Sequence, residues 1–336
     1  MQKSGTIKDF LKDRLCSLGF LSPCFVTSGE IPPPEGILLK KRYLELTGNY
    51  SSFVLTGLPF ITWEPEDSSL PGDPRGLIAP FATRNYYAEA ASLLKGVLKE
   101  MKPLFGLDPR EVRIFTNSSL PEKPLAALSG LGLYGRNGLI YTEEYGSNFI
   151  IAGLAIKIDL GDRNSFRALP EADSLCGSCS LCIEACPTGA MDREKGFIKE
   201  RCLQYMASEF TLLPDPLPSL WGRIIYGCTV CQEVCPKNRN KKPGIRITRG
   251  EIGPSVSLKN LLAAGKEPGA VKTFFKKTAL DRRWISPSAL IRNGLIACGN
   301  SGDPAAASLA EEYICSAEKI WSYHALQAVR KLKKAP

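Results

Sequence analysis

Eight of the twelve cysteines in this chain lie in one stretch, at spacings that suit iron–sulfur chemistry. The first run, C-G-S-C-S-L-C-I-E-A-C-P, follows the C-x2-C-x2-C-x3-C-P pattern of four-iron clusters, and a second run, C-T-V-C-Q-E-V-C-P, follows downstream. One loop can aim three thiolates at three irons of a cubane, while the fourth iron needs a more distant ligand. The spacing therefore predicts two 4Fe-4S clusters.

The ligands of the two predicted clusters cross over between the runs, because the fourth cysteine of such a run serves the other cluster. Cluster 1 is predicted to take the first three cysteines and the last: Cys176, Cys179, Cys182 and Cys235. Cluster 2 is predicted to take the remaining four: Cys186, Cys202, Cys228 and Cys231. The segment that contains Cys202, F-I-K-E-R-C-L-Q-Y-M, is predicted to be a helix.

Two other uses of cysteine fit the pattern less well. Structural zinc sites usually show two C-x2-C pairs rather than this longer run ending in proline. Disulfides form in oxidising compartments, and charges interrupt the N-terminal segment, unlike a secretory signal peptide. No apolar run reaches the roughly 20 residues of a membrane-spanning helix. We therefore expect a cytoplasmic protein.

Positive charge is concentrated in the last third of the chain. The formal net charge is +9, and residues 237–336 contain 19 Lys and Arg against 7 Asp and Glu. Such a region is typical of a protein that binds a polyanion, and nucleic acid is the first candidate. The alternative is a basic face that is only solvated and has no partner. The single histidine, His324, is expected to be a packed or surface residue, so histidine acid–base chemistry is nearly excluded.

Hydrophobic patterning predicts three consecutive domains. Residues 1–165 are predicted to be α/β, with strands at 52–61, 112–116 and 148–158 and helices at the N-terminus, 86–101 and 122–131. Strand 148–158 is apolar on both faces, which favours a central place in the sheet. Residues 166–245 hold the cysteine runs. Residues 246–336 are predicted to be helical at 286–298, 304–315 and 317–333, an order typical of helical repeats.

A glycine-rich loop precedes the cysteines, in the segment P-E-K-P-L-A-A-L-S-G-L-G-L-Y-G-R-N, and Y-G-S follows it. This segment resembles the Gly-Leu-Gly-x-x-Gly-Lys-Asn loop and the later Gly-Ser pair of epoxyqueuosine reductases. The order of this loop, the eight cysteines and the tail R-N-G-L-I-A-C-G-N-S-G-D-P also match. The resemblance covers roughly residues 75–310.

The resemblance implies an oxidoreductase that removes the epoxide oxygen of epoxyqueuosine in tRNA, the last step of queuosine synthesis. It implies a nitroreductase-like sheet domain that binds cobalamin base-off, a ferredoxin-like two-cluster module, and a small HEAT-like helical tail that faces the tRNA anticodon stem-loop. A low-potential donor of the ferredoxin or flavodoxin type would supply electrons. We expect a monomer.

The resemblance also implies residue roles. Six residues would lie near the corrinoid: Tyr134, Arg136, Asn137, Ile140, Gly146 and Ser147. Glycines let a backbone approach a bulky cofactor, although a tight turn is the alternative reason for them. No Asp-x-His cobalt ligand is present, because Ser-Tyr precedes His324.

Three positions depart from the family pattern. The family's proton-donating Asp is Asn117 here, and an amide cannot act as a general acid near neutral pH. The family's Asp-Tyr-His reads Asn-Tyr-Tyr at 85–87, and its Gly-Lys-Asn lysine is Arg136. Either another acid serves, such as Tyr134 or Tyr86, or the substrate differs.

Two alternatives therefore stay open. A related cobalamin-dependent reductase could act on another small electrophile, and activity without RNA would favour it. A corrinoid-free electron-transfer protein would bind two clusters but no cobalamin, and the glycine loop would then be only a turn.

Overall fold

The computed structural model describes residues 2–31, 48–62, 72–161 and 175–334. They form two compact units, each assembled from separate stretches of the chain. Unit 1 comprises Met1–Thr62, Tyr86–Ser180 and Cys235–Ile247, and unit 2 comprises Trp63–Asn85, Leu181–Val234 and Thr248–Pro336. This division cuts across the three consecutive domains expected from the sequence, and those boundaries stay a prediction.

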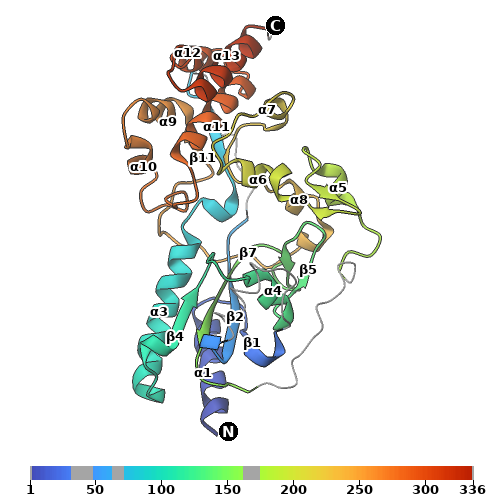
Figure 1. The fold of residues 1–336 in the computed structure, drawn as a ribbon, viewed down its shortest axis with the longest axis vertical. Coiled ribbons are helices and arrows are strands. Elements are labelled where there is room, and N and C mark those ends of the chain that lie inside the picture. The colour runs from blue at the N-terminus through green and yellow to red at the C-terminus, as the bar shows by residue number, and fades with distance from the viewer. Residues whose placement is uncertain (1, 32–47, 63–71, 162–174, 335–336) are drawn as a thin grey trace. The chain divides into compact units, whose positions relative to one another are not determined.

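Unit 1 is built on a four-stranded sheet in the order β1-β2-β7-β4 (Figure 1). The strands are β1 Cys24–Thr27, β2 Ser52–Pro59, β4 Val112–Phe115 and β7 Phe149–Ile156, and every neighbouring pair is antiparallel. Seven of the eight positions of β7 are buried. The apolar run at 148–158 is thus confirmed as a central strand, because both of its faces are covered.

The helices of unit 1 follow the predicted hydrophobic spacing. They are α1 Gln2–Ser17, α3 Tyr86–Phe105 and α4 Glu122–Leu128, with short 3-10 turns at Ser28–Glu30, Pro109–Glu111 and Pro236–Asn238. On α1, Ile7, Leu11 and Leu15 are buried. A two-stranded hairpin, β5 Leu133–Tyr134 with β6 Ile140–Tyr141, follows α4. It carries the glycine loop, and we call residues 133–141 the glycine hairpin.

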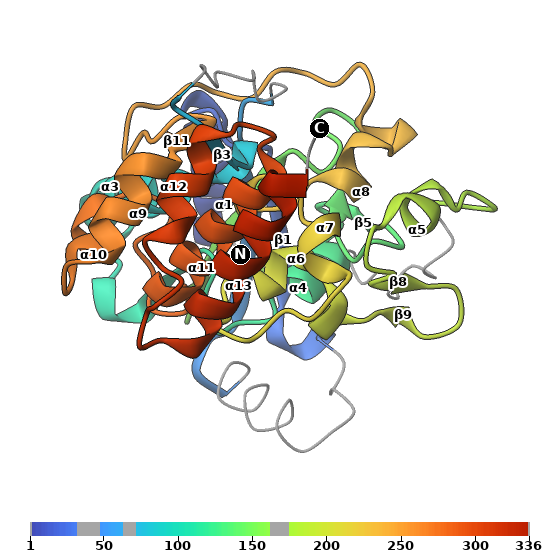
Figure 2. The same cartoon turned by 90° about the horizontal axis from the view of Figure 1, so that it is seen from above.

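Unit 2 joins a small sheet to a helical tail. Strand β3 (Arg75–Ile78) pairs in parallel with β10 (Ile224–Tyr226) and antiparallel with β11 (Ser255–Ser257). The tail helices are α9 Leu258–Gly265, α10 Ala270–Phe274, α11 Pro287–Asn300, α12 Ala305–Glu311 and α13 Lys319–Lys334. Figure 2 shows α11, α12 and α13 packed side by side, and α11 is buried along most of its length. The three helices expected at 286–333 are confirmed.

The segment of unit 2 with the cysteines is made of short elements: α5 Leu181–Ala185, β8 Met191–Asp192, β9 Gly196–Phe197, a 3-10 turn Lys199–Arg201, α6 Leu203–Met206, α7 Leu217–Leu220 and α8 Val230–Glu233. Cys182 lies on α5 and Cys231 on α8, and the other cysteines of this segment lie between elements. The expected helix through Cys202 is wrong. Cys202 has extended backbone angles (φ −72°, ψ 125°), because it is the cap residue of α6 and its carbonyl accepts the Met206 N–H. The preceding hairpin leaves room for only a 3-10 turn.

The described part of the chain contains no helix both long and apolar enough to cross a membrane. Its mixed α/β composition agrees with the expected fold class.

Candidate functional site

Three cysteines from separate segments of unit 2 lie close together. Burial, with smaller contributions from the thiolate charges of Cys202 and Cys186, raises the pKa of Cys228 to about 11. That electrostatic effect requires proximity. Helix α8, which carries Cys231, packs against α5, which carries Cys182. Cysteine-bearing segments far apart in sequence therefore lie close together in unit 2, while the division of the cysteines between two clusters stays a prediction.

The turn after Cys186 supplies hydrogen-bond donors to its sulfur. The Ala190 N–H donates to Cys186 Sγ at 3.3 Å, and Thr188 Oγ1 lies 3.6 Å from the same sulfur. Gly189 makes this wrapping possible with a positive φ of 59°. Backbone donors of this kind stabilise a metal-bound thiolate.

In unit 1, Arg136 of the glycine hairpin forms hydrogen bonds with the loop that begins the first cysteine run. Its guanidinium donates to the carbonyl oxygens of Gly177 at 2.7 Å and Cys179 at 2.6 Å. Its backbone N–H lies 3.5 Å from Cys176 Sγ. A lysine ammonium lacks the planar fork that serves two carbonyls at once, which gives a physical reason for arginine at this position.

A second contact joins the glycine hairpin to the last cysteine. Burial, and next the nearby Cys235 side chain, raises the pKa of the Tyr141 phenol, and Asn137 Nδ2 donates to Tyr141 Oη at 2.8 Å. The Ser147 N–H donates to Asn238 Oδ1 at 2.8 Å, three residues beyond Cys235. The hairpin and the Gly146-Ser147 pair thus hold the segment around Cys235.

The glycines of this region are required by the protein's own packing. A Cβ at Gly132 would lie 2.5 Å from the Tyr141 carbonyl oxygen, and one at Gly135 would lie 2.7 Å from the Tyr141 ring. At Gly146 a Cβ would lie 2.2 Å from Asn238 Oδ1. The tight-turn explanation therefore accounts for these glycines without a cofactor.

The structure brings the six residues expected near the corrinoid onto the glycine hairpin and the turn that follows it. Asn137, Ile140, Gly146 and Ser147 are buried there, whereas Tyr134 and Arg136 are partly exposed. Their contact with a corrinoid stays a prediction.

Asn117 lies in an exposed turn just after β4 and has a positive φ of 48°. The N–H groups of Asn117 and Ser118 donate to the Glu122 carboxylate at 2.9 and 2.6 Å. Burial raises the pKa of Glu122. Glu122, which the sequence reasoning missed, therefore fixes the turn that presents Asn117.

The two tyrosines considered as acids differ in their surroundings. Tyr86 is fully buried, and its hydroxyl donates to the Ile245 carbonyl at 3.1 Å, as a core residue would. Tyr134 is partly exposed, and burial of its ring raises the pKa of its phenol, which keeps the proton on it at neutral pH. Only Tyr134 combines a retained proton with access to solvent.

His324 is a packed residue, 1% exposed, and its Nε2 accepts the Leu213 N–H at 3.4 Å. Burial and the Arg292 charge lower its pKa to about 4. It belongs to the core of unit 2.

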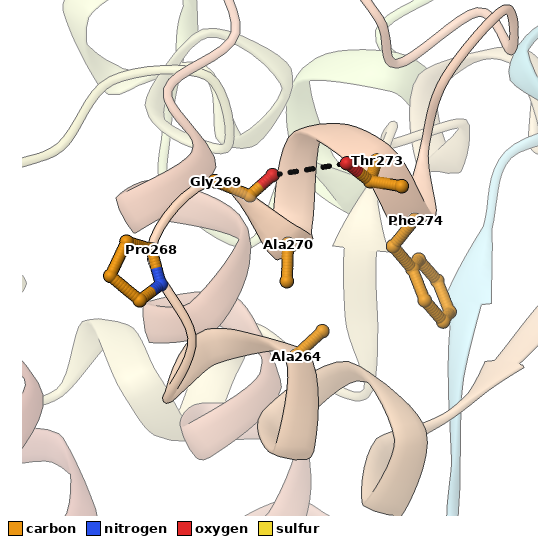
Figure 3. Close-up of a pocket in the computed structure, with 6 residues that line it drawn as sticks. All are labelled: Ala264, Pro268, Gly269, Ala270, Thr273 and Phe274. Atoms are coloured by element: carbon orange, nitrogen blue, oxygen red, sulfur yellow. Dashed lines mark hydrogen bonds between the residues drawn. The ribbon is translucent and has the colours of Figure 1, made fainter.

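A separate cavity of about 540 Å³ lies in the tail (Figure 3). The described residues that line it are Ala264, Pro268, Gly269, Ala270, Thr273 and Phe274. They include no cysteine and little polar chemistry.

The described residues contain no three His, Cys, Asp or Glu side chains that converge on one metal-ion position. A four-iron cluster places each thiolate on a different iron, so its ligands are spread more widely than those of a single ion.

Comparison with known proteins supports this account of the cysteines. Residues 175–238 match the family described as a 4Fe-4S double cluster binding domain. Relatives named epoxyqueuosine reductase include that of Lactococcus garvieae, 29% identical over 196 residues, which are 56% of this chain and 51% of the relative. That of Francisella cf. novicida is 34% identical over 194 residues, 57% of this chain and 52% of the relative. The aligned part spans about half the length of these relatives.

Solved structures show the same fold. Epoxyqueuosine reductase from Streptococcus thermophilus has a TM-score of 0.81 at 22% identity, covering 98% of this chain and 91% of that one. An epoxyqueuosine reductase solved with an epoxyqueuosine-modified tRNA-Tyr stem loop has a TM-score of 0.78, with the same identity and coverage. The resemblance seen in the sequence is confirmed: the chain has a double 4Fe-4S cluster binding domain and the fold of epoxyqueuosine reductases.

Proposed function

We propose that this chain is a cobalamin- and iron–sulfur-dependent reductase that removes the epoxide oxygen of epoxyqueuosine in tRNA. The observation that carries the proposal is the double-cluster domain directly behind a glycine hairpin that contacts its cysteines. The names of the curated relatives support the same activity.

The cysteines would hold the clusters in the crossed arrangement. Cys176, Cys179, Cys182 and Cys235 would bind one cluster, and Cys186, Cys202, Cys228 and Cys231 the other. The closeness of three cysteines of the second set, and the donors at Cys176 and Cys186, support this assignment.

The residues present fit a base-off cobalamin in one respect. The only histidine, His324, is buried in unit 2, and its Nε2 accepts a backbone N–H. It is therefore not placed to be a cobalt ligand. Tyr134 and the hairpin backbone would contact the corrinoid. When bound, the clusters would supply single electrons, and cobalamin would supply a cobalt centre that becomes nucleophilic on reduction.

The proton for the opened epoxide needs a source other than Asn117. Tyr134 is the better candidate, because its phenol stays protonated and is partly exposed. Asn117→Asp should preserve or raise turnover, since Asp also tolerates the positive φ of this turn and would restore a titrating acid. Loss of turnover in Asn117→Asp, with folding unchanged, would count against the alignment of Asn117 with the family's acid.

The basic tail would supply the RNA surface. Lys272, Lys276 and Arg283 are exposed, and so are two aromatic side chains near them, Phe274 at 37% and Trp284 at 47%. Lysines and arginines would neutralise phosphates, and exposed aromatics can stack on unpaired bases.

The RNA surface can be tested with a charge-reversed pair. Lys272→Glu/Lys276→Glu should weaken anticodon stem-loop binding and reduce its salt dependence. Lys95→Glu/Lys99→Glu, an exposed pair on α3 with the same change in charge, is the control. Equal losses in both double variants would indicate a general charge effect rather than a binding face.

The whole proposal is tested by EPR of anaerobically reconstituted protein titrated with cob(II)alamin, followed by mass spectrometry of epoxyqueuosine-containing tRNA after reaction. About eight irons, one base-off cobalamin per chain and conversion to queuosine would support it. Intact clusters without cobalamin binding would leave an electron-transfer protein.

A related reductase with another substrate is the second candidate, because the residue in the proton donor's place is an amide. Cobalamin binding with turnover of a small epoxide, and none of tRNA, would favour it.

A further inference from the structure

The first two residues of helix α4 bind two different loops of unit 1. The Glu122 carboxylate accepts the N–H groups of Asn117 and Ser118 at 2.9 and 2.6 Å. The next residue, Lys123, donates from Nζ to the Gly138 carbonyl oxygen at 2.7 Å. One side chain therefore holds the turn that carries Asn117, and its neighbour holds the glycine hairpin.

Helix α4 is a rigid base for these two contacts. Its last four residues, 125–128, are buried. Leu125 belongs to the same apolar core as Phe53 of β2 and Phe115 of β4. Because close packing holds this end of the helix, the first turn is fixed with it, and either loop must adjust to the helix rather than the reverse.

The turn that carries Asn117 depends on contacts from outside it. Asn117 is exposed and has a φ of 48°, in the left-handed region that residues other than glycine seldom adopt. Strained backbone of this kind persists only where the surrounding structure determines it. The two hydrogen bonds to the Glu122 carboxylate are charge-assisted, which makes them stronger than hydrogen bonds between neutral groups.

We propose that Glu122 and Lys123 form a clamp that fixes the Asn117 turn relative to the glycine hairpin, and that both are positioning residues for the reaction. The inference rests on the proposed function, in which Asn117 stands in the place of the family's acid and the hairpin faces the corrinoid. A misplacement of about 1 Å can slow a reaction by about 100-fold. The spacing of the two loops therefore matters to turnover, although neither residue of the clamp would touch the substrate.

A purely structural role for Glu122 makes a different prediction. An acidic residue in the first turn stabilises a helix through the helix dipole, so its loss would weaken α4 and the core against which it packs. Hydrogen exchange would then rise in the buried strand β7 as well as in the turn. If Glu122 acts as a clamp, exchange rises in the turn alone, and kcat falls while KM for tRNA stays constant.

The experiment is hydrogen–deuterium exchange of the full chain, read by mass spectrometry on peptides that cover residues 116–121 and strand β7. Glu122→Gln should speed exchange at 116–121 severalfold, the effect of about one lost hydrogen bond, and should lower kcat at an unchanged iron content. Glu143→Gln, an exposed carboxylate of the same unit, is the matched control and should change neither. Unchanged exchange at 116–121, or an equal rise in β7, would overturn the proposal.

A second variant tests the contact with the hairpin. Lys123→Met keeps the aliphatic stem and removes the ammonium group that Gly138 accepts from. In the wild-type protein, added cobalamin should slow exchange at 116–121, because the clamp joins the turn to the hairpin. This slowing should be lost in Lys123→Met and kept in Lys95→Met, at an exposed site on α3.

The two ways to fail can be told apart. Slowing by cobalamin that is as large in Lys123→Met as in the wild-type protein would contradict the clamp. A wild-type protein that binds no cobalamin would count against the proposed function, and the exchange of Glu122→Gln without cobalamin would still decide whether Glu122 holds the turn.

Discussion

The two groups of cysteines are surrounded by different chemistry, although their spacing is similar. In unit 1, the Arg136 N–H of the glycine hairpin lies 3.5 Å from Cys176 Sγ, and the Tyr141 phenol, whose pKa burial and next Cys235 raise, lies near Cys235. In unit 2, Cys186 accepts its backbone donor from its own following turn, and Cys228 packs against the apolar core. One group is thus supported by polar side chains from outside its loop and the other by burial.

This difference shows that spacing determines whether a cluster can bind, while neighbouring elements determine its potential. Donors stabilise the additional negative charge of a reduced cluster, and desolvation opposes it, as the raised pKa of Cys228 indicates. We therefore expect the cluster that Cys235 holds to have the higher potential of the two.

The largest effect should follow from removing one ligand of the second group. Cys202→Ala should reduce bound iron from about eight to about four per chain and abolish one of the two EPR signals. The cluster assigned to Cys235 should keep its potential. Cys315→Ala, an exposed cysteine outside the runs, is the control and should keep all its iron. Full iron content in Cys202→Ala would show that Cys202 is not a ligand.

Arg292 should be the next most sensitive position, because it supports the segment that follows Cys202. Its guanidinium is fully buried and donates to the carbonyl oxygens of Met206, Glu209 and Thr211 at 2.7–2.9 Å. Arg292→Met removes these donors and leaves buried carbonyls unsatisfied, which should cost about 3 kcal/mol or more.

The measurement for Arg292→Met is urea unfolding together with the rate of iron release to a chelator. Unit 2 should unfold at lower urea, and the second cluster should be lost first. Arg330→Met, at an exposed site on α13, should behave like wild type. Loss of both clusters at equal rates would contradict the separation of the two environments.

Periodicity and cysteine spacing predicted much of this fold. The central strand at 148–158 and the tail helices followed from apolar spacing, since packing selects for it. The Cys202 helix failed, because helical spacing cannot show that a hairpin ends immediately before it. Strand β11 was missed, because three residues are too few to show a period.

The site was predicted less completely than the fold. The eight cysteines were recognisable because their spacing is local, whereas the contacts of Arg136 and Tyr141 join residues about 40 and 94 positions apart. Sequence patterns do not report such distances. From the sequence, the glycines indicated only a loop. The structure shows that Gly132 and Gly135 pack against Tyr141, which leaves no room for a side chain at either position.

His324 should make the folding stability of unit 2, which contains the second group of cysteines, depend on pH. Its folded pKa of about 4 lies below the ordinary value of 6.5, so the unfolded chain binds more protons between these values. The stability it contributes is complete above pH 6.5 and is lost as pH falls toward 4, by about 3 kcal/mol in total.

This prediction is checked by urea unfolding at several pH values in wild type and in His324→Gln. Gln can still accept the Leu213 N–H but does not titrate, so the variant should lose less stability between pH 6.5 and 4. Parallel pH curves for the two proteins would mean that His324 is not the group responsible.

The smallest effect should come from Arg136→Lys, which separates the charge of this side chain from its geometry beside Cys176. Arg136→Lys keeps the positive charge and the backbone N–H beside Cys176, but one ammonium cannot hold the Gly177 and Cys179 carbonyls as a fork does. The potential of the cluster assigned to Cys176 should therefore stay nearly constant, while its iron is released severalfold faster to a chelator. Arg110→Lys, an exposed residue paired with Asp108, controls for the substitution itself. A marked shift in potential would mean that the guanidinium acts on the cluster through its charge distribution and not only by holding the loop. The contrast between a polar and a buried group of cysteines would then depend on the Arg136 side chain as well as on Tyr141.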